Sequence, residues 1–410
     1  MRSATPAARR RVVVTGIGVR TCLGHTAERF FQRLVAGESG IGRHPVHDLT
    51  TEVAWVDFRG EDHFTKPQLR VMDRVSQMAV LCARDAVQAA DLTREALPER
   101  TGVLMGTAVG SMASFEGHFE RHFSGLRPHA VVPAIMPNSA ASHVAIQLGV
   151  TGACQTFSSA CAASTQAMGE GFHKVASGYL DVALVGGSES GLMPGFMAAW
   201  EAMGVLADSA SFPSGTACRP FSADRNGVIL GEGAAMLVLE PLEAALARGA
   251  HPICELIGYG ESSDASHIVA PDPAGQARAM TRALADAGLA VEDIDYVHAH
   301  ATGTGRGDAV EAEAIGRVFG GRAAQVPVSS TKSAHGHLLG AGGAVEGVAV
   351  AMALQRKVVP PTTHWHAEDP ACPFDCVPGK GRAAATMRHA MLNSFGFGGS
   401  NAVLVMKAWA

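Results

Sequence analysis

Cys161 has the clearest potential for chemistry in this chain, because small residues surround its thiol in the segment 157–164, FSSACAAS. A helix-compatible run follows at 165–176. A cysteine at the start of a buried helix lies at the positive end of the helix dipole, which lowers a thiol pKa from about 8.5 to roughly 3.5–7.5. The small neighbours would let an acyl group reach the sulfur. The alternative is a buried structural cysteine, because free cysteine is among the most buried residue types.

Three further segments place polar groups in loops of small residues. The first, 297–308, reads VHAHATGTGRGD and follows a β-rich run; the second, 329–337, reads SSTKSAHGH; the third, 393–401, reads NSFGFGGSN. One such loop is usually a turn or a polar surface feature. Four such segments in one order in one chain have a very small joint chance of occurring.

Together these segments resemble the β-ketoacyl-acyl-carrier-protein synthases, most closely the elongating type I and type II enzymes of fatty-acid synthesis. The ketosynthases of type II polyketide systems are a close second. The resemblance begins at Arg11 and covers nearly the whole chain. It implies a decarboxylative condensation, in which an acyl chain held on Cys161 is extended by two carbons from malonyl-acyl carrier protein. It implies no metal and no organic cofactor on the enzyme, because the phosphopantetheine belongs to the carrier.

The resemblance also implies roles for the catalytic residues. Cys161 is expected to be the nucleophile, and His300 and His337 are expected to donate hydrogen bonds to the malonyl thioester oxygen during decarboxylation. The backbone N–H groups of Cys161 and Phe397 would hold the thioester oxyanion. Lys332 is expected to order the site electrostatically, with a general base as the sharper alternative.

Other residues are expected to bind substrate or to support the site. Thr302 and Thr304 match positions that hydrogen-bond the pantetheine arm, and Val109 and Phe395 match positions that contact substrate. The acids expected to support the site are Asp308, Glu311 and Glu346. Lys332 is expected to act through Glu311 or Asp308.

Two residues depart from the family pattern. Ala301 stands where glycine is usual, and a positive φ there would cost about 1 kcal/mol. His335 stands where threonine or valine is common, and we expect it to be a bystander.

Composition limits the remaining possibilities. The chain has 410 residues, of which 47% are hydrophobic and 17% charged, so two domains or one duplicated unit are expected. A net charge of −5 provides no basic field for nucleic acid. No uninterrupted apolar run of about 20 residues predicts a membrane span. The eight cysteines lack zinc-type spacing, so reduced thiols in the cytoplasm are expected.

Short β-rich runs alternate with helical patterns, which predicts an α/β fold with sheets covered on both faces. A small-residue helix follows Cys161 and another follows Lys332, so the chain reads as two similar halves, 1–250 and 251–410. The resemblance implies the same arrangement, the five-layered αβαβα thiolase-type fold. Strands are expected at 12–16, 101–105, 182–186, 235–239, 254–257, 296–299, 326–329 and 402–406, and helices at 74–90 and 276–287.

Three other functions would explain part of this pattern. A thiolase normally has a second active-site cysteine near its C-terminus, a chain-length factor usually lacks the nucleophile, and a cysteine hydrolase would leave Lys332 and the Phe397 loop unexplained. The expected partners are an acyl carrier protein and a second subunit, either a copy of the chain or a chain-length factor. Lys66 and Arg70 are candidates for docking the acidic carrier, although an ordinary solvated helix start explains them equally well.

Overall fold

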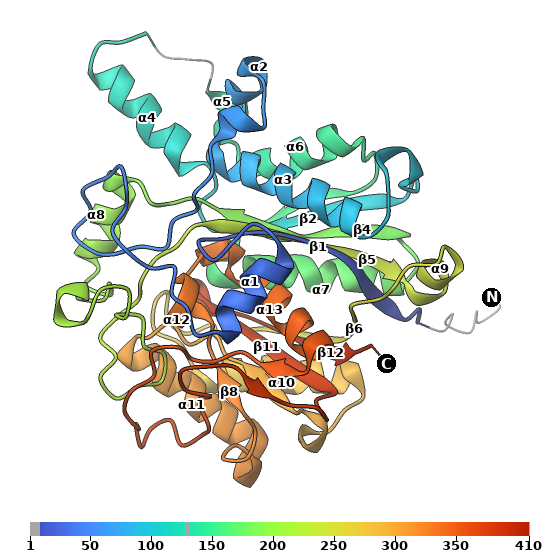
Figure 1. Cartoon of the computed structure of the whole chain (residues 1–410), viewed down its shortest axis with the longest axis vertical. Coiled ribbons are helices and arrows are strands. Elements are labelled where there is room, and N and C mark those ends of the chain that lie inside the picture. The colour runs from blue at the N-terminus through green and yellow to red at the C-terminus, as the bar shows by residue number, and fades with distance from the viewer. Residues whose placement is uncertain (1–8, 128–130, 410) are drawn as a thin grey trace.

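Ten of the twelve strands in this computed structural model, which describes residues 9–127 and 131–409, form two units of five that join edge to edge in one sheet (Figure 1). The strand order is β3-β2-β4-β5-β1-β6-β12-β11-β7-β8, and β9 and β10 form a separate pair. The first eight residues of the expected N-terminal half lie outside the described part of the chain. The strands are β1 (Val12–Arg20), β2 (Thr101–Gly106), β3 (Cys154–Phe157), β4 (Val182–Glu189), β5 (Gly233–Pro241), β6 (Cys254–Ser263), β7 (Tyr296–His298), β8 (Val328–Ser329), β9 (Val358–Val359), β10 (Arg382–Ala383), β11 (His389–Gly396) and β12 (Ser400–Ala408).

The two units have the same topology when read outward from their shared edge. In the first, β1 pairs with β5 and β5 with β4 in antiparallel fashion, and β4 with β2 and β2 with β3 in parallel fashion. In the second, β6, β12, β11, β7 and β8 repeat this sequence of pairings. Residues 12–14 pair with 254–256 where the units join. The second half therefore repeats the first strand for strand, while the boundary at residue 250 stays a prediction.

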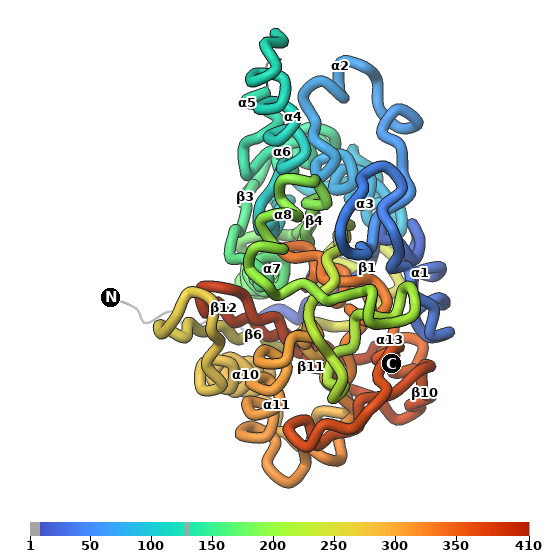
Figure 2. The backbone as a smooth tube through the Cα atoms, turned by 90° about the vertical axis from the view of Figure 1, so that its left-hand side faces the viewer, coloured from blue at the N-terminus to red at the C-terminus, as the bar shows by residue number. Residues whose placement is uncertain are grey.

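Helices cover both faces of each unit and separate the two units. Helices α7 and α13 contact each other in the middle layer, α3 packs on β1 and β5 outside one unit, and α10 packs on β6 and β12 outside the other. Figures 1 and 2 show these layers, with α4 projecting at the upper end. The five-layered αβαβα arrangement expected from the sequence is therefore present. The helices are α1 (Ala27–Val35), α2 (Lys66–Leu69), α3 (Arg74–Ala89), α4 (Met112–Phe123), α5 (Val132–Ile135), α6 (Ser139–Leu148), α7 (Ala163–Ala176), α8 (Pro194–Ala202), α9 (Leu242–Ala247), α10 (Pro273–Ala287), α11 (Gly305–Phe319), α12 (Lys332–His335) and α13 (Gly342–Arg356).

Burial explains why these segments fold as they do. Every residue of β1, β4 and β5 is buried, as near-continuous apolar strands covered on both faces should be. Helix α13 is buried around its whole circumference over 342–354, because it lies between the two units. Among the described helices, none is long and apolar enough to cross a bilayer.

Strand β1 is longer than the sequence predicted. The run was expected to end at Gly16, yet the strand continues to Arg20. A Cβ atom at Gly16 would lie 2.1 Å from the Ala86 carbonyl oxygen, and one at Gly18 would lie 2.0 Å from the Cys82 carbonyl oxygen. These glycines let α3 pack directly against the strand backbone, so here glycine marks a close approach and not a strand end.

Candidate active site

Cys161 lies on a tight turn between β3 and α7. Residues Ala160–Ala162 form a single 3₁₀ turn, and α7 begins directly after it at Ala163. Ala160 adopts the left-handed conformation with φ of +50°, which a residue with a side chain occupies only at a cost. The thiol is 8% exposed. The prediction that Cys161 lies near a helix start is correct. The structure adds that the residue lies on a strained turn just before the helix.

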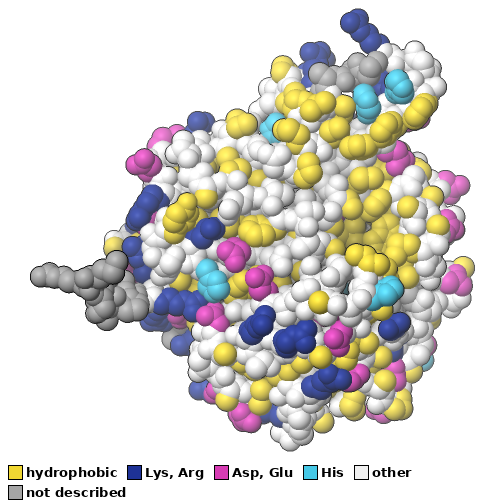
Figure 3. Space-filling model, turned by 180° about the vertical axis from the view of Figure 1, so that it is seen from behind, with side chains coloured by type: hydrophobic (Ala, Val, Ile, Leu, Met, Phe, Trp, Pro, Cys, Tyr) yellow, Lys and Arg dark blue, Asp and Glu magenta, His cyan; other side chains and the backbone are white. Residues whose placement is uncertain are grey.

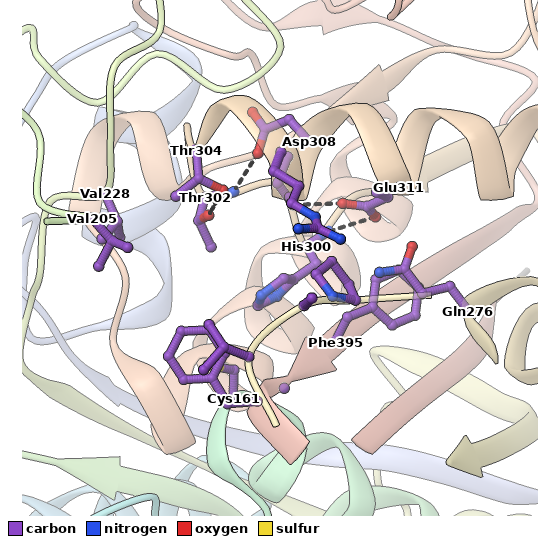
Figure 4. A pocket seen from close by; sticks show the side chains of 18 of the residues that line it. Cys161, Val205, Val228, Gln276, His300, Thr302, Thr304, Asp308, Glu311 and Phe395 are labelled. Carbon is purple, nitrogen blue, oxygen red and sulfur yellow. Dashed lines mark hydrogen bonds between the residues drawn. The ribbon is translucent and has the colours of Figure 1, made fainter. Parts of the chain in front are cut away.

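Two histidines from the second half meet this thiol (Figure 4). The Cys161 Sγ lies 2.9 Å from His337 Nε2, although 176 positions separate the two residues. The His300 and His337 rings are 5.4 Å apart, centroid to centroid, at 83°. One side-chain atom from each of the three residues lies within 4.8 Å of the others. The structure therefore brings together the nucleophile and both predicted histidines.

The ionisation of this trio differs from the sequence-based expectation. Burial raises the pKa of the Cys161 thiol to about 12, against the opposing influences of the Lys332 charge and the Phe397 backbone N–H. Burial, and then the Lys332 charge, lowers the pKa of His300 and of His337 well below the usual value. The expected low-pKa thiolate is thus wrong for the free site, because desolvation outweighs the favourable charges. Both shifts favour the neutral forms of the thiol and of the imidazoles.

The Phe397 loop closes over the sulfur. The Phe397 backbone N–H lowers the pKa of the Cys161 thiol, against the larger effect of burial. A Cβ atom at Gly396 would lie 3.0 Å from the Cys161 nitrogen and 2.8 Å from the Ser159 carbonyl oxygen, so glycine lets the two backbones approach. The Phe397 ring, 37% exposed, stacks against Trp200 of α8 with centroids 6.0 Å apart. The two N–H groups expected to form an oxyanion hole thus lie in adjoining segments.

Lys332 pairs with a different acid from the one expected. Its Nζ lies 2.5 Å from Glu346 Oε1, and the side chains of the two residues are 0% and 1% exposed. The expectation that Lys332 acts through Glu311 or Asp308 is therefore wrong. The pairing joins the short helix α12 to the central helix α13, which sequence spacing alone did not reveal. Lys332 does not line the cavity at Cys161. Its charge therefore affects the pKa of Cys161 and of the two histidines without contact with the cavity.

Glu311 and Asp308, both on α11, instead hold the loop that carries His300. Glu311 accepts hydrogen bonds from the His300 N–H at 2.8 Å, the Ala301 N–H at 2.7 Å and the Asn393 side chain at 3.1 Å. Asp308 accepts from the Thr302 N–H at 3.1 Å and from other backbone N–H groups. Burial raises the pKa of Glu311 to about 7 and that of Asp308 to about 6.

Neither departure from the family pattern disturbs the site. Ala301 does not adopt a positive φ, so the anticipated strain is absent, and the left-handed position in this loop is Gly303 with φ of +86°. His335 is buried away from the cavity, where its Nε2 lies 2.8 Å from Thr331 Oγ1 and its Nδ1 lies 2.9 Å from the Gly336 carbonyl oxygen. Burial lowers its pKa to about 3, which keeps it neutral.

A cavity of about 310 Å³ opens beside Cys161. Thr302 and Thr304 line it, with their hydroxyl oxygens 3.2 Å apart, and so does Phe395, whose ring lies 6.1 Å from that of His300. Val109 does not line this cavity, because its loop turns it outward to 36% exposure. The expected place of Val109 at the acyl pocket therefore stays a prediction.

Sequence reasoning missed several lining residues and one supporting acid. Glu189, at the end of β4, accepts hydrogen bonds from the N–H groups of Ala108 at 2.6 Å and Gly340 at 3.1 Å, and so ties together loops from the two halves. The sequence could have indicated Glu189, because it is an acid at the end of a strand that is otherwise mostly apolar. Four missed lining residues have no local signal, because distant elements contribute them: Trp200, Val205, Val228 and Gln276. Arg306 and Asn401 also line the cavity, and they lie within the segments 297–308 and 393–401 that the sequence singled out.

The proposed docking residues lie apart from this cavity. Lys66 starts α2 and Arg70 follows its end. Both are exposed, and neither forms an ion pair with any described residue. They are therefore available for an acidic partner.

A five-layered fold in which a buried cysteine meets two histidines between repeated halves defines the thiolase-type condensing enzymes. Within that class the chain belongs to the β-ketoacyl synthase family, because residues 9–245 match the model of the β-ketoacyl synthase N-terminal domain and residues 253–366 that of the C-terminal domain. Both the family and the thiolase-type fold predicted from the sequence are thus confirmed.

Individual proteins agree with this assignment. Nodulation protein E of Rhizobium sp. (strain N33) is 41% identical over 97% of this chain and 99% of its own length. 3-Oxoacyl-[acyl-carrier-protein] synthase 2 of Staphylococcus aureus (strain COL) is 39% identical over 97% of this chain and 98% of its own length. The solved structure of the ishigamide ketosynthase/chain length factor matches with a TM-score of 0.91 and 36% identity, covering 98% of this chain and 100% of that one.

Proposed function

We propose that this chain condenses an acyl group held on Cys161 with malonyl-acyl carrier protein, giving β-ketoacyl-acyl carrier protein and carbon dioxide. The observation that carries the proposal is the 2.9 Å contact between Cys161 Sγ and His337 Nε2, with His300 beside them. The presence of the nucleophile argues against a chain-length factor. The segment 393–401 contains no cysteine, which argues against a thiolase.

Acyl transfer would begin with the neutral pair. As Cys161 Sγ attacks the incoming thioester carbonyl, its proton passes to His337 Nε2, which avoids a buried free thiolate. The carbonyl oxygen becomes an oxyanion that the N–H groups of Cys161 and Phe397 can hold. Loss of one such donor typically costs roughly 10²–10³ in rate. The carrier thiol then leaves as the carbon–sulfur bond breaks and takes up the proton.

Condensation would follow on a malonyl group whose pantetheine arm lies along Thr302 and Thr304. When the bond to the carboxylate breaks and carbon dioxide leaves, negative charge develops on the malonyl thioester oxygen. His300 and His337, which burial and Lys332 keep neutral, can donate hydrogen bonds to that oxygen. The enolate carbon then attacks the carbonyl carbon of the Cys161 thioester. The carbon–sulfur bond breaks, and the leaving sulfur takes up a proton from water by way of His337, which restores the neutral thiol.

The partners follow from the same reaction. An acyl carrier protein would deliver both substrates on its phosphopantetheine, so the enzyme itself needs no organic cofactor; the Staphylococcus aureus relative is named for such a carrier. Lys66 and Arg70 remain our candidates for its docking. The fatty-acid or type II polyketide pathway, a cytoplasmic location and the division into 1–250 and 251–410 also stay predictions.

A second subunit would cover the outer face of α4. Phe115, Phe119 and Phe123 recur every fourth residue along this helix and are 40%, 45% and 81% exposed. In Figure 3 hydrophobic side chains gather next to the grey residues, which include those between α4 and α5. An exposed apolar stripe of this kind suits an interface between subunits. The subunit is a copy of this chain or a chain-length factor, as in the ishigamide structure.

Replacement of the nucleophile tests the central proposal. Cys161→Ala should abolish condensation while the melting temperature stays near that of the wild type. Cys154→Ala is a matched control, because Cys154 is a free, exposed cysteine on the preceding strand. Product formation at a near wild-type rate by Cys161→Ala would show that the nucleophile is assigned wrongly.

A further inference from the structure

The three side chains that meet at the reaction centre also form a set of metal ligands. Cys161, His300 and His337 each place one ligand atom, a sulfur or an imidazole nitrogen, within 4.8 Å of the other two. Within the described part of the chain, this is the one group of His, Cys, Asp and Glu side chains close enough to hold a metal ion. The condensation proposed above uses these residues without a metal. Their arrangement therefore has a second capacity that this reaction does not need.

The spacing of the ligand atoms is close to that of a tetrahedral zinc site. Zinc binds cysteine sulfur at about 2.3 Å and histidine nitrogen at about 2.0–2.1 Å, so tetrahedral geometry places sulfur and nitrogen about 3.5 Å apart and two nitrogens about 3.3 Å apart. The contact between Cys161 Sγ and His337 Nε2, now 2.9 Å, would lengthen by about 0.6 Å. A pair at the upper limit of 4.8 Å would close by about 1.3–1.5 Å. Small side-chain rotations supply movements of this size.

An ion can reach all three residues from the cavity, because each of them lines it. Figure 4 shows Cys161 and His300 together there, on segments from opposite halves of the chain. The cavity, at about 310 Å³, has room for water molecules, each of which takes about 30 Å³ in the liquid. Three protein ligands and one water make up the four positions of an open zinc site.

The chemistry of the donor atoms selects the metal. Thiolate and imidazole suit zinc, whereas magnesium and calcium prefer oxygen ligands. The acids that border the cavity do not supply such a set, because Glu311 and Asp308 already accept hydrogen bonds from the backbone of the His300 loop. As the zinc–sulfur bond forms, the sulfur–hydrogen bond breaks and the proton passes to solvent.

The surroundings of the ligands favour reversible binding. In a resident zinc site the second nitrogen of a ligating histidine nearly always donates a hydrogen bond, and loss of that partner costs about 10–100-fold in affinity. Nδ1 of His337 has no hydrogen-bond partner among the described residues. The site should therefore hold zinc less tightly than a structural zinc centre does.

We propose that Cys161, His300 and His337 bind one zinc ion, which blocks the nucleophile and inhibits the enzyme reversibly. The metal site stands on the contacts among the three side chains, whereas the inhibition rests on the proposed function. The ion occupies both the sulfur and the His337 nitrogen that would receive its proton during acyl transfer. Acylation in turn removes the thiolate ligand. Zinc and the acyl group should therefore exclude each other.

Metal binding is measured on the metal-free full chain. The zinc retained after gel filtration gives the stoichiometry, and cobalt(II) in place of zinc gives a sulfur-to-cobalt charge-transfer absorption when a thiolate is a ligand. We expect one ion per chain, displacement of cobalt by zinc and no displacement by magnesium. Zinc should also slow alkylation of Cys161 by iodoacetamide, followed by peptide mass, and a chelator should restore the rate. Enzyme alkylated beforehand at Cys161 should show no cobalt–sulfur absorption.

Single variants identify the ligands. Cys161→Ser should abolish the cobalt–sulfur absorption. His300→Ala should weaken zinc binding by at least about 10–100-fold, because loss of even an outer partner has this effect. His300→Gln is a second variant if alanine lowers the melting temperature. Cys154→Ala should bind zinc as the wild type does, because Cys154 is a free, exposed cysteine that does not line the cavity.

The possible failures of the two proposals are distinguishable. The inference is overturned if the wild type retains no zinc and shows no cobalt–sulfur absorption. It is also overturned if the Cys161 and His300 variants bind zinc as tightly as the wild type, or if Cys154→Ala loses the ion, since the metal then lies elsewhere. If zinc binds as described but the zinc-free chain accepts no acyl group from an acyl carrier protein, the proposed function fails and the metal site stands.

Discussion

Separation of the buried Lys332–Glu346 pair tests how the reaction centre is held. Lys332→Met leaves a buried carboxyl group without its counter-charge, and Glu346→Leu leaves a buried ammonium group alone. Removal of one partner of a buried pair costs about 3–5 kcal/mol. At about 2.1 cal/mol/K of unfolding entropy per residue, this corresponds to a melting temperature lower by roughly 4–6 °C for 410 residues.

The loss in Lys332→Met should depend on pH. Burial raises the pKa of Glu346, and Lys332 opposes that rise. Without Lys332 the folded-state pKa moves further above the unfolded value, so at low pH the carboxyl group is buried in its neutral form at little cost. The deficit relative to the wild type should therefore be small below the ordinary pKa of 4.5 and grow as the pH rises toward the folded-state pKa.

The double variant Lys332→Met/Glu346→Leu separates stability from chemistry. Two apolar side chains of similar volume should restore most of the lost stability. Condensation should stay slow, because the Lys332 charge opposes the rise in the Cys161 pKa and helps to keep both histidines neutral. Thermal melts, together with Cys161 alkylation as a function of pH, measure both effects. A double variant as unstable as the sum of the two single variants, or one that condenses at the wild-type rate, would refute this reasoning.

Three more predictions concern the histidines, Glu189 and carrier docking. His300→Ala and His337→Ala should each block malonyl decarboxylation yet permit some acyl transfer, with the greater loss of transfer in His337→Ala because that ring contacts the sulfur; normal carbon dioxide release by both would contradict the assigned roles. Burial raises the pKa of Glu189 from 4.5 to about 7. The melting temperature of the wild type relative to that of Glu189→Gln should therefore fall as the pH rises from 4.5 to about 7. A difference in melting temperature that does not change with pH would contradict this prediction. Lys66→Glu with Arg70→Glu should weaken carrier binding and its salt dependence but not alkylation of Cys161, and unchanged affinity at low salt would place docking elsewhere.

The chemical centre could be predicted from the sequence because its members lie in short, distinctive segments. Cys161, His300 and His337 meet as expected, and the Phe397 loop approaches the backbone of Cys161. The partner of Lys332 could not be predicted, because Glu346 becomes its neighbour only when α12 packs on α13.

The lining of the cavity and the details of the sheets were harder to predict from the sequence. Trp200 and Gln276 have no local signal, because each reaches the cavity only through the packing of its helix. Val109 does not line the cavity at Cys161, and its expected role at the acyl pocket stays a prediction. The edge strand β3 was not predicted, since its four residues are neither buried nor strongly periodic.

The repeat of five strands has a consequence for how the enzyme comes into being on the ribosome. Cys161 belongs to the first repeat, whereas His300, His337 and the Phe397 loop belong to the second. The first repeat is synthesised earlier than the second. Its Cys161 thiol therefore lacks the catalytic partners of the second repeat until β11 and β12 have paired in the sheet. The nucleophile and its histidines therefore cannot meet until strands of both repeats have been made. The duplication thus delays the onset of acyl chemistry until the cavity that confines it is complete.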